Sequence, residues 1–276
     1  MEINGQTKLA AVIANPIKHS LSPFIHNFAF EQVNENGIYL AFEIVQEALE
    51  TTISSIKSLD MYGANLSMPY KEAALAYMDD VSEVAKLTGA INTIVNQDGR
   101  LFGTTTDGVG FFKSINEFVV KDSEIIVLGA GGAARAIIAE ATLQGAKQIT
   151  VYNRTYKPEL FEHYPGNIMV KPLQALTELS GDLLINTTSV GMDGVSMPID
   201  STMIIPQNMI VADVIYQPIE TPLLAYAKLQ GNQTVNGLGM LLYQAAESFK
   251  LWTGKKMPTE LIWPELEKKV YGKNKC

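Results

Sequence analysis

The sequence predicts an α/β protein with two domains, each built on a mostly parallel sheet, and a cleft between them. In the first third of the chain, short apolar runs alternate with helical patterns, which is typical of a parallel sheet covered on both faces. A second strand–turn–helix series begins at residues 125–128, the most hydrophobic short run, and continues to about residue 235. The length of 276 residues exceeds one average domain and also favours two.

The first domain is predicted from alternating strand and helix patterns. Its expected strands are short apolar runs bounded by turn residues, at 9–13, 38–44, 62–66, 92–95 and 100–103. Its expected helices have apolar residues at helical spacing, at 22–33, 46–59 and 70–78. Ser22-Pro23 marks the start of the first helix, and Asp98-Gly99 indicates the turn of a strand pair.

The second domain is expected to follow a boundary near residues 104–120, bridged by a helix at 107–118. Its buried strand at 125–128 leads into a helix that ends near residue 144, and a strand follows at 148–152. The last amphipathic helix, at 238–252, ends at Gly254 and is expected to return to the first domain. The predicted domains are therefore residues 1–106 with 238–276, and residues 107–237.

Composition excludes several classes of protein. Hydrophobic residues make up 47% and charged residues 18%, which argues against disorder, and the net charge of −8 argues against a nucleic-acid partner. The only basic cluster, Lys268-Lys269 with 273–275, is expected to be a solvated end. Cys276 is the only cysteine, so a disulfide within the chain is impossible. A polar start and the lack of a run of about 18 apolar residues predict a cytoplasmic protein without a membrane segment.

A glycine-rich turn follows the strand at 125–128. Its residues fit G-x-G-x-x-G/A and are Gly129, Ala130, Gly131, Gly132, Ala133 and Ala134. Such a turn lets backbone amides approach a pyrophosphate at a helix N-terminus, although similar turns occur without ligands. The next strand ends in Asn153-Arg154-Thr155, where an NAD enzyme usually has a carboxylate. Arg154 can pair with a 2′-phosphate, which favours NADP, unless it is an ordinary surface charge.

Polar residues in the first domain form further clusters after predicted strands. Ser20 is a candidate ligand contact, whereas Ser22 is either a contact or a helix N-cap. His19 and His26 are expected to be packing or surface residues. Lys71 is predicted to begin a helix, an unfavourable place for a cation, and this indicates function.

Amides and hydroxyls extend these clusters. Asn65 and Ser67, two apart at a strand end, point to one side. Asn92 lies in a third cluster, and Asp107 is either a site residue or a helix cap. Together these groups predict a pocket for a polyhydroxylated small molecule. No set of His and Cys has metal-ligand spacing, so no metal is expected.

Taken together, the short sequence motifs of this chain resemble those of the shikimate dehydrogenase family over nearly its whole length. The matching words are Pro16-Ile-Lys-His-Ser-Leu-Ser-Pro23, Asn65-Leu-Ser-Met-Pro-Tyr-Lys71, Gly89-Ala-Ile-Asn-Thr93, Thr106-Asp107, Gly129-Ala-Gly-Gly-Ala-Ala134, Asn153-Arg-Thr155, Asn186-Thr-Thr-Ser-Val-Gly-Met192, Asp213-Val-Ile-Tyr216 with Thr221-Pro222, and Asn236-Gly-Leu-Gly-Met-Leu-Leu-Tyr-Gln244. The resemblance implies a Rossmann-like NADP domain beside a substrate domain, and oxidation of shikimate to 3-dehydroshikimate or the reverse.

The resemblance also implies roles for individual residues. It implies that Lys71 and Asp107 are the catalytic pair. The implied substrate contacts are Ser20, Ser22, Asn65, Ser67, Lys71, Asn92, Asp107, Tyr216 and Gln244. The implied NADP contacts are the glycine turn, Asn153, Arg154, Thr155, Glu83, Val214, Gly237 and Met240. The chain departs from the family at Ala14, Thr105 and Ser67, where Gly, Asn and Thr are usual; Thr105 puts the support of Asp107 in doubt.

Three alternatives stay open at this stage. A quinate/shikimate dehydrogenase would accept quinate and often NAD, but Ser20 with Ser22 and Arg154 argue against it. Folate-linked dehydrogenases share the two-domain architecture without the Ser-Leu-Ser and Gly-Leu-Gly-Met words. A catalytically silent nucleotide sensor is disfavoured because Lys71 and Asp107 are both present. The chain is expected to be a monomer or a homodimer.

Overall fold

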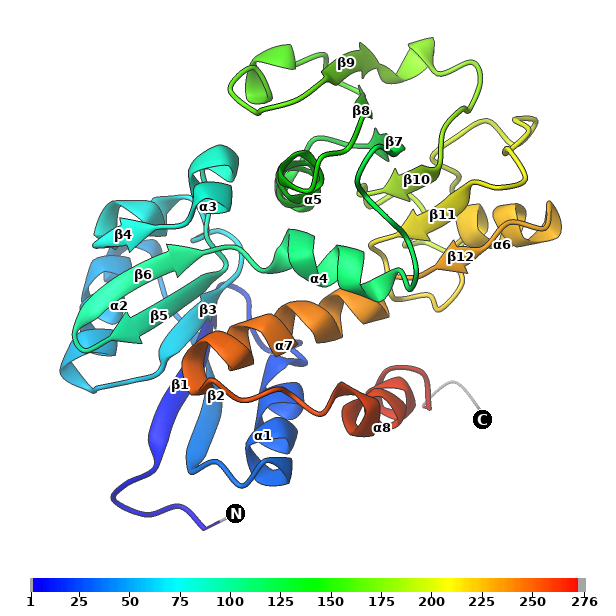
Figure 1. Cartoon of the computed structure of the whole chain (residues 1–276). Helices are drawn as coiled ribbons and strands as arrows, with labels where there is room; N and C mark the ends of the chain where they lie inside the picture. The colour runs from blue at the N-terminus through cyan, green and yellow to red at the C-terminus, as the bar shows by residue number, and fades with distance from the viewer. Residues whose placement is uncertain (1, 273–276) are drawn as a thin grey trace. The chain divides into compact units, whose positions relative to one another are not determined.

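The computed structural model describes residues 2–272, so Cys276 and the lysines at 273–275 lie outside the described part of the chain. The chain forms two compact units. The first unit comprises Met1–Thr106 and Leu242–Cys276, and the second unit comprises Asp107–Leu241. Both units are α/β, as the sequence predicts (Figure 1).

The first unit is built on a six-stranded sheet with the order β2-β1-β3-β5-β6-β4. Its strands are β1 (Lys8–Ala14), β2 (Gly37–Glu43), β3 (Gly63–Leu66), β4 (Asp80–Val81), β5 (Thr93–Gln97) and β6 (Arg100–Thr104). β1 runs parallel to β2 and β3, and β4 runs parallel to β6. β5 is antiparallel to both of its neighbours, β3 and β6. Asp98 and Gly99, both with positive φ, close the tight hairpin that joins β5 to β6.

Helices cover this sheet on both faces. The α-helices are α1 (Ser22–Gln32), α2 (Leu49–Ser58), α3 (Glu83–Thr88), most of α7 (Leu238–Thr253), and α8 (Thr259–Tyr271). On one face, α2 and α3 bury apolar side chains such as Ile53 and Ala85 against the strands. On the other face, Phe30 of α1 packs on Phe249 of α7, with ring centroids 5.0 Å apart. The Trp252 indole of α7 donates to the Ile94 carbonyl at 2.9 Å, which joins this helix to β5.

The prediction of an α-helix over 70–78 is wrong in type. A short 3₁₀ helix, η2 (Ala73–Tyr77), lies there instead, while a second one, η1 (Gln46–Ala48), precedes α2. Both ends of the segment are bound to strands or their extensions: the Ile91 amide donates to the Lys71 carbonyl at 2.8 Å, and the Asp79 amide donates to the Leu101 carbonyl at 2.9 Å. Lys71 lies in a turn and does not begin an α-helix, so the prediction that a cation stands at an unfavourable helix N-terminus is also wrong.

The second unit has an entirely parallel six-stranded sheet with the order β12-β11-β10-β7-β8-β9. Its strands are β7 (Glu124–Leu128), β8 (Gln148–Asn153), β9 (Ile168–Pro172), β10 (Leu183–Asn186), β11 (Ile210–Asp213) and β12 (Thr234–Val235). Counted from β7, this is the order of a Rossmann fold, so that prediction is confirmed. The order reverses between β7 and β10, which makes the carboxyl ends of these strands the switch point where ligands bind.

The helices and turns of the second unit are mostly short. They are α4 (Asp107–Ser114), α5 (Gly132–Leu143), η3 (Pro158–Leu160), η4 (Leu173–Ala175) and α6 (Pro222–Leu229). α4 packs closely on α5, since a Cβ on Gly108 would lie 2.3 Å from the Ala136 carbonyl oxygen. The helix expected at 107–118 ends at Ser114, because Glu117 takes a left-handed backbone conformation with φ of 65°. The predicted strand at 125–128 and the helix ending at Thr253 before Gly254 are confirmed.

Candidate functional site

The glycine turn connects β7 to α5 at the switch point of the second sheet. Gly129 has φ of +103°, and a Cβ there would lie 2.7 Å from the Thr187 hydroxyl oxygen, so both conformation and space require glycine. Gly131 occupies the N-cap position of α5, and a Cβ on Gly131 or Gly132 would meet nothing within 4 Å. Open backbone amides therefore face solvent at a helix N-terminus. This is the arrangement that a pyrophosphate needs.

The end of β8 places Asn153, Arg154 and Thr155 beside this turn. The Gly129 amide donates to the Tyr152 carbonyl at 2.8 Å, which joins the turn to the neighbouring strand. The Asn153 side chain donates to the Thr155 carbonyl at 2.8 Å and fixes the loop, while Arg154 is exposed. An exposed guanidinium beside a glycine-rich turn is a group that can pair with a phosphate.

A second polar cluster holds the loops that follow β10 and β11. Asp213, which is 1% exposed, accepts hydrogen bonds from the Asn186 side chain at 3.1 Å and from the Thr221 hydroxyl at 2.8 Å. Its other oxygen accepts from the Ile215 amide at 3.0 Å. Burial raises the pKa of Asp213, and these three hydrogen bonds oppose that shift. The cluster fixes the segment that contains Val214 and Tyr216.

Two more predicted NADP contacts of the second unit are Gly237, which lies beside the segment of Val214 and Tyr216, and Met240, which lies on α7. A Cβ on Gly237 would lie 2.0 Å from the Val214 carbonyl oxygen, so only glycine allows the chain to pass there. Tyr216 is half-buried, and burial raises the pKa of its phenol. Met240 is half-buried in the first turn of α7. The structure thus brings Val214, Tyr216 and Gly237 into one region.

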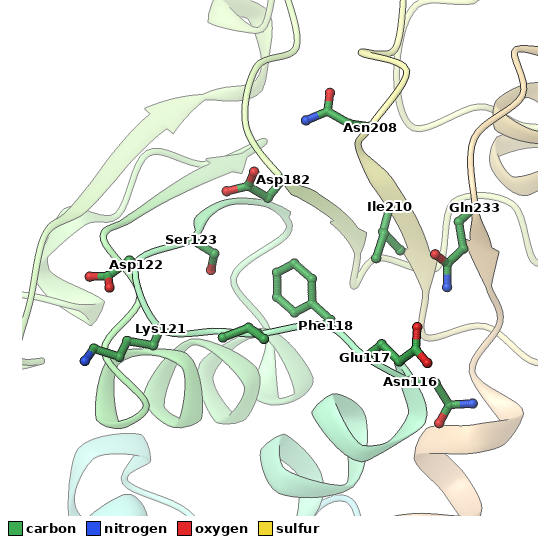
Figure 2. A pocket seen from close by; sticks show the side chains of 11 residues that line it. Asn116, Glu117, Phe118, Lys121, Asp122, Ser123, Asp182, Asn208, Ile210 and Gln233 are labelled. Atoms are coloured by element: carbon green, nitrogen blue, oxygen red, sulfur yellow. The ribbon is translucent and has the colours of Figure 1, made fainter.

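A hollow of the second unit lies at the amino ends of the strands, opposite the end that holds the glycine turn. It measures about 520 Å³ and lies beside the starts of β7, β10, β11 and β12 (Figure 2). Figure 2 shows Phe118 and Ile210 among carboxylates and amides such as Asp182 and Gln233. Because ligands of a Rossmann fold bind at the carboxyl ends of strands, this hollow is separate from the glycine turn.

The first unit contains a buried network of polar side chains. Its members contact one another across β2, β3, β5 and α7 and are Tyr39, Asn65, Asn92, Thr93, Thr106 and Ser248. The Tyr39 hydroxyl donates to Asn65 Oδ1 at 2.7 Å. Asn65 Nδ2 lies 3.1 Å from the Thr93 hydroxyl and 3.0 Å from the Ser248 hydroxyl. This set is called the first-unit polar network below.

The network extends to the predicted serines after β1. The Ser22 amide donates to the Ser20 hydroxyl at 3.3 Å. Ser22 also hydrogen-bonds the buried Tyr39 phenol, whose pKa is raised by burial and lowered in part by this bond. The N-cap interpretation of Ser22 is wrong, because Leu21 holds the N-cap position and Ser22 is the first helical residue. Ser20 and Ser22 are partly exposed, so both remain open to a ligand.

Asn92 connects the network to the segment before Asp107. Its Oδ1 accepts from the Thr106 amide at 2.9 Å, and its Nδ2 donates to the Thr106 hydroxyl at 3.0 Å. Thr106 is followed directly by Asp107, the first residue of α4. Thr105, which stands where the family usually has Asn, is 8% exposed.

The remaining predicted residues occupy different surroundings. Ser67 is exposed after β3, and its amide donates to the Ile13 carbonyl at 3.1 Å. Lys71 is partly exposed in the turn that follows. Gln244 lies on α7, where its carbonyl accepts from the Ser248 hydroxyl at 3.1 Å. Glu83 is the exposed first residue of α3.

Sequence reasoning did not select Tyr39 and Ser248, although both belong to the network. Ser248 lies four residues after Gln244 on α7, and this helical spacing was the available signal. His26 is fully buried and stacks on Tyr39, whereas His19 is exposed; neither contacts the predicted ligand groups as a donor or acceptor among the described residues. The expectation of packing and surface roles for these two residues fits this placement.

Within residues 2–272, no group of three or more His, Cys, Asp or Glu side chains is placed to hold a metal ion. In that same part of the chain, every helix is too short or too polar to cross a bilayer.

Comparisons with known proteins identify the family. The model of the shikimate dehydrogenase substrate binding domain matches residues 12–94, and that of the shikimate 5'-dehydrogenase C-terminal domain matches residues 237–267. The NADP(+) shikimate dehydrogenase of Streptococcus suis is 52% identical, over 98% of this chain and 99% of its own. The chain belongs to the shikimate dehydrogenase family. The resemblance predicted from the sequence words is therefore confirmed.

Solved structures of shikimate dehydrogenases agree in fold. The enzyme from Listeria monocytogenes, in complex with shikimate and NAD, is 35% identical with a TM-score of 0.91, covering 96% of this chain and 98% of that chain. The enzyme from Thermus thermophilus, in complex with NADP(H) and shikimate, is 34% identical with a TM-score of 0.84, covering 95% and 99%. These similarities extend through both units, so the family relationship is not confined to one of them.

Proposed function

We propose that this chain oxidises shikimate to 3-dehydroshikimate with NADP and also catalyses the reverse reduction, as a step in aromatic amino-acid biosynthesis. The observation that carries the proposal is full-length identity of 52% to an NADP-dependent shikimate dehydrogenase. The Gly129 turn and Arg154 support NADP as the cofactor, because an exposed glycine turn and an exposed guanidinium follow two adjacent strands. We further propose that the first unit binds the substrate and the second unit binds NADP.

The proposed substrate contacts differ in exposure. Asn65 and Asn92 are buried and already hydrogen-bonded within the first-unit polar network. Ser20, Ser22 and Lys71 are partly exposed, and Ser67 is exposed. We propose that the exposed hydroxyls recognise the substrate while the buried amides hold their strands in place. Tyr216, Gln244 and Asp107 complete the proposed set.

The chemistry requires removal of a hydride and of a hydroxyl proton from one secondary alcohol. NADP, when bound, accepts the hydride. We propose that Lys71 contacts the reacting oxygen and that Asp107 lies next to it. The Lys71–Asp107 pair takes up the hydroxyl proton, and the positive charge on Lys71 stabilises the negative charge that develops on the oxygen as the proton leaves. The proposed NADP contacts are the glycine turn, Asn153, Arg154, Thr155, Glu83, Val214, Gly237 and Met240.

Initial-rate assays of NADPH formation test the proposed function. The purified chain should reduce NADP with shikimate much faster than with quinate, and faster than it reduces NAD. Comparable rates with quinate would instead indicate a quinate/shikimate dehydrogenase. NADP binding without turnover of either substrate would indicate a nucleotide sensor, and would refute the proposal.

A lysine variant tests the catalytic assignment. Lys71→Ala should lower kcat by about 10²- to 10⁴-fold, the range typical of a lost proton-transfer group, with little change in shikimate binding. The exposed Lys256 provides a matched control, because Lys256→Ala removes an equal charge from a helix connection. If kcat of Lys71→Ala stayed within a few fold of the wild type, the assignment of Lys71 would be wrong.

We also propose that the protein acts in the cytoplasm as a monomer or homodimer on small molecules, without a nucleic-acid partner. The charge of −8 supports this proposal, because nucleic-acid surfaces repel an acidic chain. Light scattering after gel filtration measures the oligomeric state directly.

A further inference from the structure

One buried hydroxyl contacts several elements of the first unit at once. Ser248, on α7, is fully buried, and its Oγ lies 3.0 Å from Asn65 Nδ2 and 2.9 Å from the Thr93 hydroxyl. It lies 3.3 Å from the Thr106 hydroxyl and donates to the Gln244 carbonyl at 3.1 Å. A serine hydroxyl has one donor and two acceptor positions, so its donation to Gln244 and two of the other three contacts fill its hydrogen-bonding capacity. Ser248 therefore connects α7 with β3, β5 and the segment before α4.

Thr253, on the same helix, has a hydroxyl that lies outside the first-unit polar network. Thr253 donates to the Phe249 carbonyl at 2.8 Å, the usual bond from a helical hydroxyl to the preceding turn. Ser248 makes the equivalent bond to Gln244 but also contacts three polar side chains from other elements. Helix stability accounts for the first bond only. The other contacts therefore act on the side chains of Asn65, Thr93 and Thr106, whose positions they restrict.

Apart from Thr93, the hydrogen-bond partners of Ser248 are either proposed substrate contacts or the sequence neighbour of the proposed catalytic residue Asp107. Asn65 is a proposed substrate contact, and Thr106 directly precedes Asp107. Gln244, also a proposed contact, lies one turn before Ser248 on α7. In a buried setting, an amide or hydroxyl that loses its partner moves to find another, because an unsatisfied polar group is costly there. Loss of the Ser248 hydroxyl would therefore remove one partner from Asn65 and one from Thr106, and both side chains would shift toward the partners that remain.

We propose that Ser248 is a positioning residue for the dehydrogenase reaction, acting through Asn65 and Thr106. The inference rests on the proposed function. Its hydroxyl keeps the Asn65 carboxamide in one orientation and holds Thr106, and hence the start of α4, in place. Since all partners of Ser248 lie in the first unit, the effect falls on the shikimate side of the reaction. NADP binding at the glycine turn stays unchanged.

Steady-state kinetics of paired variants test this proposal. Ser248→Ala should lower kcat/KM for shikimate about 10- to 100-fold, the scale expected when catalytic groups shift by fractions of an ångström to one ångström. The KM for NADP should stay within about twofold of the wild type. Ser248→Thr keeps the hydroxyl and should recover most of the lost activity. Thr253→Ala removes a helical hydroxyl outside the network and should leave both parameters unchanged.

The outcomes separate positioning from structural support. Equal losses for shikimate and NADP, or a loss in Thr253→Ala as large as in Ser248→Ala, would overturn the proposal. So would a kcat/KM of Ser248→Ala within twofold of the wild type. If Ser248→Ala does not fold, Ser248→Cys replaces it, because its thiol is a weaker hydrogen-bonding group; the same shikimate-selective loss is expected, and wild-type kinetics would overturn the inference. A wild-type chain inactive on shikimate would refute the proposed function itself.

Discussion

His26 is a buried histidine whose protonation should unfold the first unit. Its ring is wholly buried on α1, and both ring nitrogens are without a hydrogen-bond partner among the described residues. The ring stacks on Tyr39 at 4.2 Å between centroids, with Trp252 at 5.3 Å and Phe249 at 6.2 Å. None of these aromatic groups offers a negative charge to an imidazolium. Burial accordingly lowers the pKa of His26 to about 3.

The direction of the pH effect follows from proton linkage. An unfolded histidine has a pKa of about 6.5, so the unfolded chain binds this proton more tightly than the folded chain. Above about pH 6.5, His26 therefore does not change the free energy of unfolding with pH. As the pH falls from about 6.5 toward 3, His26 lowers the free energy of unfolding progressively. Between pH 7.5 and pH 5.0, its contribution to the free energy of unfolding should fall by about 2 kcal/mol. Below pH 3 no further loss comes from this residue.

Urea unfolding of wild type and His26→Phe at the two pH values measures this difference. Phenylalanine keeps an aromatic ring beside Tyr39 but cannot be protonated. Both tryptophans of the chain, Trp252 and Trp263, belong to the first unit, so their fluorescence reports its unfolding. The wild type should lose about 2 kcal/mol more than the variant between pH 7.5 and pH 5.0, because other groups titrate equally in both proteins.

The comparison depends only on the change with pH, so any packing cost of phenylalanine cancels. His19→Phe is the matched control, because solvent reaches the ring of His19 in the folded protein. The control should lose as much stability on acidification as the wild type. Equal losses in wild type and His26→Phe would refute the argument from burial.

Four further predictions concern the second unit. Arg154→Ala should raise the KM for NADP about tenfold or more and the KM for NAD little, since only NADP has the 2′-phosphate; equal rises would contradict the assignment. Gly131→Ala should fold normally, because its Cβ meets no atom within 4 Å, yet weaken NADP binding measured by fluorescence titration. Gly129→Ala should in addition destabilise the chain by about 1–3 kcal/mol through its positive φ, and unchanged urea unfolding would count against it. Asp213→Asn should lower stability by about 1–3 kcal/mol, because its amide would oppose buried donors; a wild-type midpoint in urea would contradict this.

Local patterns were sufficient for most of the fold. The apolar runs at 9–13 and 125–128 lie within β1 and β7, because buried parallel strands need such runs, and the run at 38–44 lies across β2, an edge strand with an exposed end. The glycine turn was equally local, since its G-x-G-x-x-G/A spacing and the positive φ of Gly129 belong to one short segment. These features depend on neighbouring residues only, so the sequence alone predicts them.

Tertiary contacts decided the parts that sequence patterns missed. Residues 70–78 have a helical pattern, but the hydrogen bonds from the Ile91 amide to the Lys71 carbonyl and from the Asp79 amide to the Leu101 carbonyl leave room only for a 3₁₀ turn. Contact between Asn65 and Ser248 joins residues 183 positions apart in the chain. No spacing rule relates such a pair, and the sequence therefore predicted Asn65 without its buried partner.

An asparagine near the carboxyl end of a central strand recurs in both units. Asn65 lies in the last two residues of β3, and Asn186 ends β10. Each is buried, and each uses both its amide nitrogen and its oxygen on protein groups: Asn186 donates to Val190 and Asp213 and accepts from Thr188. Asn186 fixes the loop that follows β10, and Asn65 joins β3 to β2, β5 and α7. Loops that are already ordered lose little entropy on binding, so more of the binding energy remains available to the transition state.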